Sequence, residues 1–350
     1  MEFLYHYGLF LAKTVTFVAA ILFVVSALAS LIRQVRQQMG DHLEVKSLNE
    51  RYRDLADALN QVLLAPDEFK REQKVRAKQD KAHAKAQKKG SEAPRPRVFV
   101  LNFQGDIQAS SVASLREEVS SVLQVARDKD EVLLRLESEG GLVHGYGLAA
   151  SQLQRVRDRK ITLTVAVDKV AASGGYLMAC VADHIVAAPF AIVGSIGVVA
   201  QLPNFNRLLK KHEIDFELHT AGEFKRTLTL FGENTEAGRA KFQQEIEDTH
   251  ALFKSFVADN RPALQLDKVA TGEHWFGTRA LALKLVDALK TSDDWLLEKS
   301  KTADLYEVSF RRHRSLGDRL SHLAKLSLRR PFAAPAMPSL PTSLNPRELL

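Results

Sequence analysis

The chain has 350 residues, of which 45% are hydrophobic and 26% are charged, a balance typical of a globular protein. A single cysteine, Cys180, excludes an intramolecular disulfide and a cysteine-rich metal site. The formal net charge is +7, and the basic residues cluster towards the two ends of the chain. This distribution favours contact with anionic lipid or nucleic acid at the ends over a basic catalytic core.

An uncharged apolar run near the N-terminus extends from Thr14 to Ile32 and is long enough to cross a bilayer core. It is long for the apolar region of a signal peptide and has no convincing cleavage site. We therefore expect an uncleaved membrane anchor rather than a buried globular helix. Arg33 and Arg36 follow the run, so the positive-inside rule favours a cytoplasmic position for the rest of the chain. Lys13, on the other flank, weakens that indication.

Residues 37–96 form a charged region between the anchor and the next domain. Residues 47–64 carry apolar side chains at helical spacing, whereas residues 69–89 are mostly Lys, Gln and Ala with little to bury. We expect a solvated helix or a disordered tether that ends in the Gly- and Pro-containing residues 90–96. Nucleic-acid binding is the weaker alternative, because no aromatic residues interleave with the charges.

A globular domain is expected over residues 97–310, between the tether and a C-terminal region of residues 311–350. Alternating apolar and amphipathic segments predict strands at residues 98–103, 132–136, 161–167, 185–187, 192–199 and 216–219, and helices at 110–126, 145–157 and 235–259. This alternation indicates an α/β fold with parallel strand pairing. After the domain, a basic helix is expected up to residue 330, either on anionic lipid, against a neighbouring subunit or in solvent, followed by a disordered Pro-rich tail.

The most informative stretch is the strand that leads into Ser173. Gly174 and Gly175 follow, and then a short apolar helix. A serine before a helix usually caps it, but the glycines also let a ligand approach, and free N–H groups at a helix start favour negative charge. A hydroxyl nucleophile beside such donors suits acyl transfer. Two further glycine turns follow strands, at Gly140-Gly141 and at Gly194-Ser-Ile-Gly197, and the first could hold a carbonyl oxygen together with the turn at Ser173.

A nucleophilic serine needs a base, and the sequence offers two kinds. The histidine candidates, with the acids that could orient them, are His144, His184, His219, Asp168 and Asp183. Lys225 is the alternative, because it follows a predicted strand and a glycine turn, and its apolar neighbours would lower its pKa. Spacing alone does not choose between them. Cys180 is expected to be a small buried residue rather than a second nucleophile.

Four segments of the chain carry a family resemblance when taken in order. They are Leu136-Glu-Ser-Glu-Gly-Gly141, Asp168-Lys-Val-Ala-Ala-Ser-Gly-Gly-Tyr176, Gly194-Ser-Ile-Gly-Val198 and Thr220-Ala-Gly-Glu-Phe-Lys225. Together they resemble the signal peptide peptidase A family of serine peptidases. The similarity is closest to its SohB branch of bacterial inner-membrane proteins with an N-terminal anchor. Two more segments support that branch: Gly145-Tyr-Gly-Leu-Ala-Ala-Ser-Gln-Leu-Gln154 and Thr271-Gly-Glu-His-Trp-Phe-Gly277.

The resemblance implies a Clp-protease/crotonase-like fold of stacked ββα units and a Ser–Lys dyad in place of a triad. Carried over, Ser173 is the nucleophile, Lys225 is the general base, and the backbone N–H groups of Gly141 and Gly174 form the oxyanion hole. It also implies homo-oligomers, no metal or organic cofactor, and peptide substrates with small or apolar residues near the cleaved bond, such as signal-peptide remnants. A catalytically silent membrane scaffold and a crotonase-type acyl-CoA enzyme are the alternatives.

Two positions depart from the family pattern. Glu139 stands where the family usually has Pro in Ser-Pro-Gly-Gly, and we expect it either to loosen the oxyanion turn or to place a carboxylate near the substrate groove. Lys284 stands where the family has Gly before Leu-Val-Asp. That position is expected to take a positive φ after a helix, where a side chain costs about 1 kcal/mol of strain.

Overall fold

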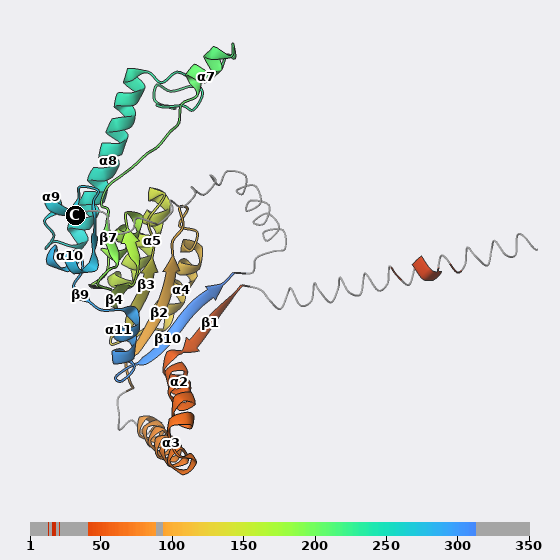
Figure 1. The fold of residues 1–350 in the computed structure, drawn as a ribbon, viewed down its shortest axis with the longest axis vertical. Coiled ribbons are helices and arrows are strands. Elements are labelled where there is room, and N and C mark those ends of the chain that lie inside the picture. The colour runs from red at the N-terminus through yellow and green to blue at the C-terminus, as the bar shows by residue number, and fades with distance from the viewer. Residues whose placement is uncertain (1–12, 14–15, 19–20, 22–40, 89–93, 313–350) are drawn as a thin grey trace, which may run out of the picture. The chain divides into compact units, whose positions relative to one another are not determined.

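The computed structural model describes residues 13, 16–18, 21, 41–88 and 94–312 of the chain. Within it, Leu43–Arg311 forms one compact unit (Figure 1). In the part of the chain that the structure describes, no helix is both long enough and apolar enough to span a membrane. Most of the expected anchor from Thr14 to Ile32 lies outside the described residues, as do the expected basic helix and Pro-rich tail after residue 312.

A seven-stranded sheet forms the centre of the unit, in the strand order β1-β10-β2-β3-β4-β6-β9. Its strands are β1 (His42–Ser47), β2 (Arg97–Gln104), β3 (Glu131–Glu137), β4 (Thr162–Val167), β6 (His184–Ala187), β9 (Ala288–Leu289) and β10 (Asp304–Arg311). From β10 to β9, every neighbouring pair is parallel. Helices α4 (Val112–Val125) and α5 (Val143–Asp158) make the crossovers between β2, β3 and β4. The α/β fold with parallel pairing is therefore confirmed.

A second, three-stranded sheet carries β5 (Val170–Ala172), β7 (Ile192–Gly194) and β8 (His274–Phe276). β5 pairs in parallel with β7, and β8 pairs antiparallel with β7. Strands β4 and β6 of the large sheet are thus each followed by a short strand of the small sheet, and α6 (Gly174–Ala179) completes the first such unit. This is the ββα arrangement that the family resemblance implies. The strand predicted over residues 192–199 ends early, at Gly194, where φ is +100°.

Both faces of the large sheet are covered by apolar side chains. Leu101, Leu134 and Val165 are buried in the larger cluster, together with residues of α4 and α5. Val100 and Leu133 are buried in a separate cluster on the other face. A parallel sheet covered on both faces has continuous apolar strands, which explains the uninterrupted runs in the sequence. Functional side chains are then expected where the strands end and the chain turns.

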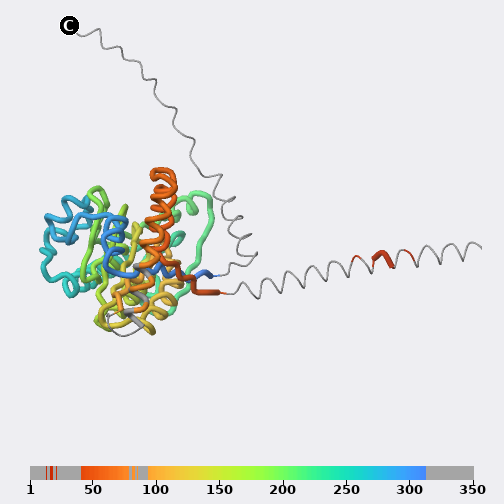
Figure 2. Tube along the Cα trace, turned by 90° about the horizontal axis from the view of Figure 1, so that it is seen from below, coloured from red at the N-terminus to blue at the C-terminus, as the bar shows by residue number. Residues whose placement is uncertain are grey.

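The compact unit begins earlier than the domain boundary expected at residue 97. Helix α2 (Leu48–Leu63) packs against β10, so residues far apart in the sequence lie side by side (Figure 2, orange and blue). The Asn49 side chain donates to two carbonyls before β10 and accepts the N–H of Leu305 at 2.6 Å. The charged region also contains α3 (Pro66–Lys88). Of the two forms expected for this region, a solvated helix and a disordered tether, the structure shows the helix.

Residues 195–235, between β7 and α8 (Glu236–Asn260), contain one short helix, α7 (Asn206–Lys211), beyond the N-terminal end of α8 in Figure 1. The strand predicted at residues 216–219 is wrong. That stretch is irregular, and Phe216 and Leu218 are 44% and 46% exposed. Alternating apolar residues form a strand only where a second strand pairs with them and a core buries one face. Within the described chain, residues 216–219 have no pairing strand and pack on no core.

Three further helices complete the unit: α9 (Leu266–Val269), α10 (Gly277–Ala282) and α11 (Ser292–Lys299). Lys284, just after α10, has a φ of +61°, which confirms the positive φ expected there. Its N–H donates to the carbonyl of Leu281, and that of Leu285 donates to the carbonyl of Ala280. These are the two bonds of a Schellman motif, and its usual glycine position is occupied here by a lysine at about 1 kcal/mol of strain.

Candidate active site

Ser173 lies in the tight turn between β5 and α6. Its φ of 52° and ψ of −119° are unusual for a residue with a side chain, and its N–H donates to the carbonyl of Gly194 at 2.8 Å. The hydroxyl makes no capping hydrogen bond to α6, so Ser173 is not the ordinary helix cap that its sequence context also allowed. A strained residue at the end of a strand, whose hydroxyl has no hydrogen bond within the described residues, is an arrangement found at functional sites.

The turn after β3 lies directly against this serine. Gly140 has a φ of +96°, and a Cβ atom on it would come within 2.8 Å of the Ser173 Cβ and 2.7 Å of the Gly174 nitrogen. Gly141 is exposed, and its N–H donates to no protein atom in the described chain. Gly174 is the first residue of α6, so its N–H lies outside the helical hydrogen bonds. Two available N–H groups thus lie in the two turns that meet at Ser173.

A buried chain of hydroxyl groups supports the Gly140 turn. The Gly140 N–H donates to Ser138 Oγ at 3.1 Å, Ser138 Oγ lies 2.6 Å from the Tyr146 hydroxyl, and that hydroxyl donates to the Asp106 carbonyl at 2.8 Å. Burial raises the pKa of Tyr146, so the hydroxyl stays protonated and able to donate. Sequence reasoning missed Ser138 and Tyr146 as supports of the site, although both lie within the segments that carry the resemblance.

An open cavity of about 1050 Å³ extends from Ser173. Its walls come from the β3–α5 turn, from α5 and α6, from the turn after β7 and from α8. The lining side chains are mostly apolar: Ile107, Leu142, Val143, Leu177, Val198, Val199, Leu252, Phe253 and Phe256. A largely apolar cleft with a few polar groups at one end is the usual form of a binding site.

Ser195 is a second hydroxyl residue beside Ser173 that sequence reasoning did not single out. Ala172 and Gly194 are register partners on β5 and β7, so the residues that follow them, Ser173 and Ser195, are neighbours. Ser195 also has a φ of 52° and lines the same cavity. Its signal in the sequence is the third glycine turn, which places a serine directly after a short buried strand.

Lys225 is not brought to Ser173 within the chain. It lies in the irregular part of residues 195–235, is exposed, and does not line the cavity. The only hydrogen bond of its backbone N–H within the described residues goes to the Gly222 carbonyl at 3.2 Å. Ser173, Gly141 and Gly174 therefore line one cavity in the structure, whereas Lys225 lies outside it.

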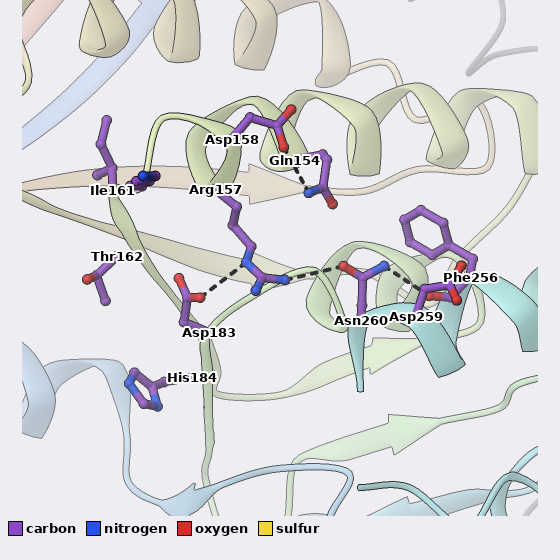
Figure 3. Close-up of a pocket in the computed structure, with 11 residues that line it drawn as sticks. Gln154, Arg157, Asp158, Ile161, Thr162, Asp183, His184, Phe256, Asp259 and Asn260 are labelled. Atoms are coloured by element: carbon purple, nitrogen blue, oxygen red, sulfur yellow. Dashed lines mark hydrogen bonds and ion pairs between the residues drawn. The ribbon is translucent and has the colours of Figure 1, made fainter. Parts of the chain in front are cut away.

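The histidine alternatives are also separate from Ser173, since His144, His184 and His219 are exposed and none lines its cavity. His184 and Asp183 line another cavity, of about 870 Å³, at the start of β4 and β6 (Figure 3). Asp183 accepts from Arg157 at 3.1 Å and from a backbone N–H. The remaining acid, Asp168, accepts from both the N–H and the hydroxyl of Ser292. Both acids have structural partners, so neither orients a catalytic histidine.

Cys180 is fully buried in the core, as expected from its apolar surroundings. Burial raises the pKa of its thiol to about 12. Since the thiolate is the reactive form, this residue is chemically inert near neutral pH. Cys180 is therefore excluded as a second nucleophile.

Comparison with known proteins identifies the family. The family model described as peptidase family S49 N-terminal matches residues 2–153, and that of peptidase family S49 matches residues 155–306. The probable protease SohB of Haemophilus influenzae is 52% identical over 317 residues, covering 89% of this chain and 90% of that protein. The probable protease SohB of Buchnera aphidicola subsp. Schlechtendalia chinensis is 47% identical over 308 residues, covering 85% of this chain and 100% of that protein.

Among solved structures, a mutant of the 1510-N membrane-bound stomatin-specific protease matches with a TM-score of 0.41 and 14% identity, over 59% of this chain and 86% of that chain. The family assignment depends on the sequence matches, which together extend from residue 2 to residue 306. This chain belongs to peptidase family S49 and is a serine peptidase.

Proposed function

We propose that this serine peptidase is an endopeptidase in which Ser173 is the nucleophile and Lys225 is the general base. Its substrates are extended, apolar peptides, such as signal-peptide remnants or segments of membrane proteins. The observation that carries the proposal is the Ser173 hydroxyl, which has no hydrogen bond within the described residues. It lies beside the turns that carry the N–H groups of Gly141 and Gly174, in a mostly apolar cavity of about 1050 Å³.

In this mechanism the Ser173 hydroxyl attacks a peptide carbonyl, and neutral Lys225 takes its proton. The backbone N–H groups of Gly141 and Gly174 stabilise the negative charge that develops on the carbonyl oxygen. Protonated Lys225 then gives its proton to the leaving amine, and an acyl-enzyme remains on Ser173. Water activated by the same lysine releases the acyl group and restores the site.

The exposed position of Lys225 supports a site that is completed by a second copy of the chain. The segment that carries the lysine also exposes Phe216, Leu218 and Phe224, which is costly for a monomer and ordinary for a subunit interface. A neighbouring chain could bury these side chains and bring its lysine to the cavity, where the Ser195 hydroxyl would orient the amine. The functional form is then a homo-oligomer.

The membrane part of the proposal depends on the sequence. The uncharged run from Thr14 to Ile32 suits a single anchor in the bacterial inner membrane. An anchored peptidase meets apolar peptides as they leave the bilayer, which agrees with the apolar lining of the cavity. A protease-protection assay on membrane vesicles would report which side of the membrane the catalytic domain occupies.

Labelling with a fluorophosphonate probe tests the nucleophile. We expect a single adduct on Ser173 in the full chain, detected by intact mass and located by peptide mapping, because an activated serine beside an oxyanion site reacts with such probes. Ser173→Ala should remove the adduct, whereas Ser151→Ala, on a serine that lines the same cavity, should keep it. A folded, oligomeric sample that takes no label would favour a membrane scaffold without catalysis.

Tyr146→Phe is expected to lower kcat/KM about tenfold while changing the free energy of unfolding by only about 1 kcal/mol. The phenyl ring fills the same space, but the hydroxyl that joins Ser138 to the Asp106 carbonyl is lost. The turn that carries Gly141 then loses its fixed position relative to Ser173. Peptide-hydrolysis kinetics and a thermal melt measure the two effects. Full kcat/KM in the variant would mean that the turn holds its position without this hydroxyl.

A further inference from the structure

Glu139 lies in the turn that brings Gly140 and Gly141 to Ser173. It is exposed and lines the cavity of about 1050 Å³. Within the described residues its carboxylate makes no ion pair and no hydrogen bond. The neighbouring acid on β3, Glu137, is different, because Lys169 lies 3.0 Å from its carboxylate. One of these two acids is therefore paired with a lysine, whereas the other lines the cavity without a cationic partner in the described part of the chain.

The rest of the cavity lining offers Glu139 no cation. The lining residues of the described chain include no lysine and no arginine. The single histidine, His250, is engaged with the Ile196 carbonyl at 3.2 Å. A peptide bound in this cleft would displace water from around the carboxylate. A cationic group on that peptide would then be attracted more strongly than in open solvent.

The position of Glu139 is also fixed relative to the reacting bond. Ser138 pairs with Ala171 in an isolated β-bridge, and the Gly140 N–H donates to Ser138 Oγ at 3.1 Å, so the backbone on both sides of Glu139 is held. Gly141, the proposed oxyanion donor, is two residues away, at most about 7 Å between Cα atoms. The carboxylate can therefore reach only the substrate side chains close to the cleaved bond.

We propose that Glu139 is a specificity-determining residue that selects a lysine or arginine side chain next to the cleaved bond of an otherwise apolar peptide. The inference rests on the proposed endopeptidase function and adds a charged subsite to it. The substrates are then apolar peptides that contain one cationic residue. This composition occurs at the ends of hydrophobic membrane segments, where lysine and arginine are common.

The test uses the full-length chain and a set of quenched fluorescent apolar peptides. In each peptide one residue, from three before to three after the cleaved bond, is either lysine or its neutral analogue norleucine. We expect kcat/KM to be about fivefold higher for lysine at one position, the effect of one partly exposed ion pair. The preference should disappear in Glu139→Gln and weaken in high salt. Glu137→Gln, which removes the same charge outside the cavity, should keep it.

Two results would overturn the inference while leaving the peptidase function in place. One is cleavage with no lysine preference at any position. The other is a Glu139→Gln variant that shifts the pH profile equally for all peptides, because Glu139 would then be the partner of the Lys225 ammonium rather than of the substrate.

A binding measurement separates the inference from the proposed function. Fluorescence anisotropy with the Ser173→Ala variant compares lysine and norleucine peptides without turnover. If the wild-type chain cleaves nothing but Ser173→Ala still prefers the lysine peptide through Glu139, the subsite stands and the proposed function fails. If Ser173→Ala binds both peptides equally, the charged subsite does not exist.

Discussion

Ser173→Ala and Lys225→Ala chains produced together in one cell are expected to regain roughly a quarter of wild-type turnover, although each variant alone should be at least about a thousandfold less active. The reason is geometric, since Lys225 does not line the cavity that contains Ser173 in its own chain. If each site takes its serine from one chain and its lysine from the next, a mixed assembly contains some sites with both groups.

The measurement needs two affinity tags, so that only assemblies containing both variants are isolated before peptide hydrolysis is followed. Lys210→Ala is the matched control, because Lys210 lies on the same 195–235 segment and its ammonium contacts Glu233. It should keep near-normal turnover in every combination. Mixed assemblies that stay inactive, although both chains are present and folded, would show that Lys225 reaches the serine of its own chain by a movement of this segment.

The strands and turns around Ser173 could be predicted from sequence because their determinants are local. Apolar runs flanked by charged residues give β3 and β4 directly. The close approach of the two turns requires glycine at position 140, since a Cβ there would clash with Ser173 and Gly174, and a Cβ on Gly174 would clash with the Tyr146 ring of α5. The positive φ at Lys284 was predicted from the family resemblance, because the family has glycine at this position, as helix ends with positive φ usually do.

Other features depend on contacts between distant residues and were not predicted. Asn49 is an ordinary polar residue in the sequence, yet its side chain joins α2 to the start of β10, more than 250 positions away. The hydroxyl chain from Ser138 to Asp106 spans three separate segments. The position of Lys225 is a further example, because the motif proposes this residue as the base, whereas the chain does not place it at the cavity that contains Ser173.

Glu118→Gln is expected to stabilise the protein at pH 8 and to have little effect at pH 5. Glu118 is on α4, is 5% exposed, and accepts the N–H of Phe310 on β10 at 2.8 Å. Burial raises the pKa of this carboxyl from 4.5 to about 7, against a smaller opposing effect of the Phe310 hydrogen bond. Ionisation is therefore disfavoured in the folded state.

The sign of the pH dependence follows from the raised pKa. Below pH 4.5 the carboxyl is neutral in both the folded and the unfolded chain, and its effect on stability is most favourable. Between pH 4.5 and about 7 the unfolded chain ionises before the folded one, so the free energy of unfolding falls with rising pH, by about 3 kcal/mol in total. Above pH 7 the loss is complete and stays constant.

Denaturant unfolding of the wild-type and Glu118→Gln chains at pH 5 and pH 8 measures this difference. The glutamine carbonyl can still accept the Phe310 N–H, but the side chain cannot ionise. The free energy of unfolding of the variant should therefore not fall between pH 5 and pH 8 on account of this residue, and the variant should be the more stable protein at pH 8. Comparing two chains at each pH cancels the contributions of other titrating groups. Glu117→Gln, a substitution at the exposed neighbouring residue, should have the same free energy of unfolding as the wild type at both pH values. Equal stability of wild type and Glu118→Gln at both pH values would mean that β10 and α4 separate enough to hydrate the carboxylate.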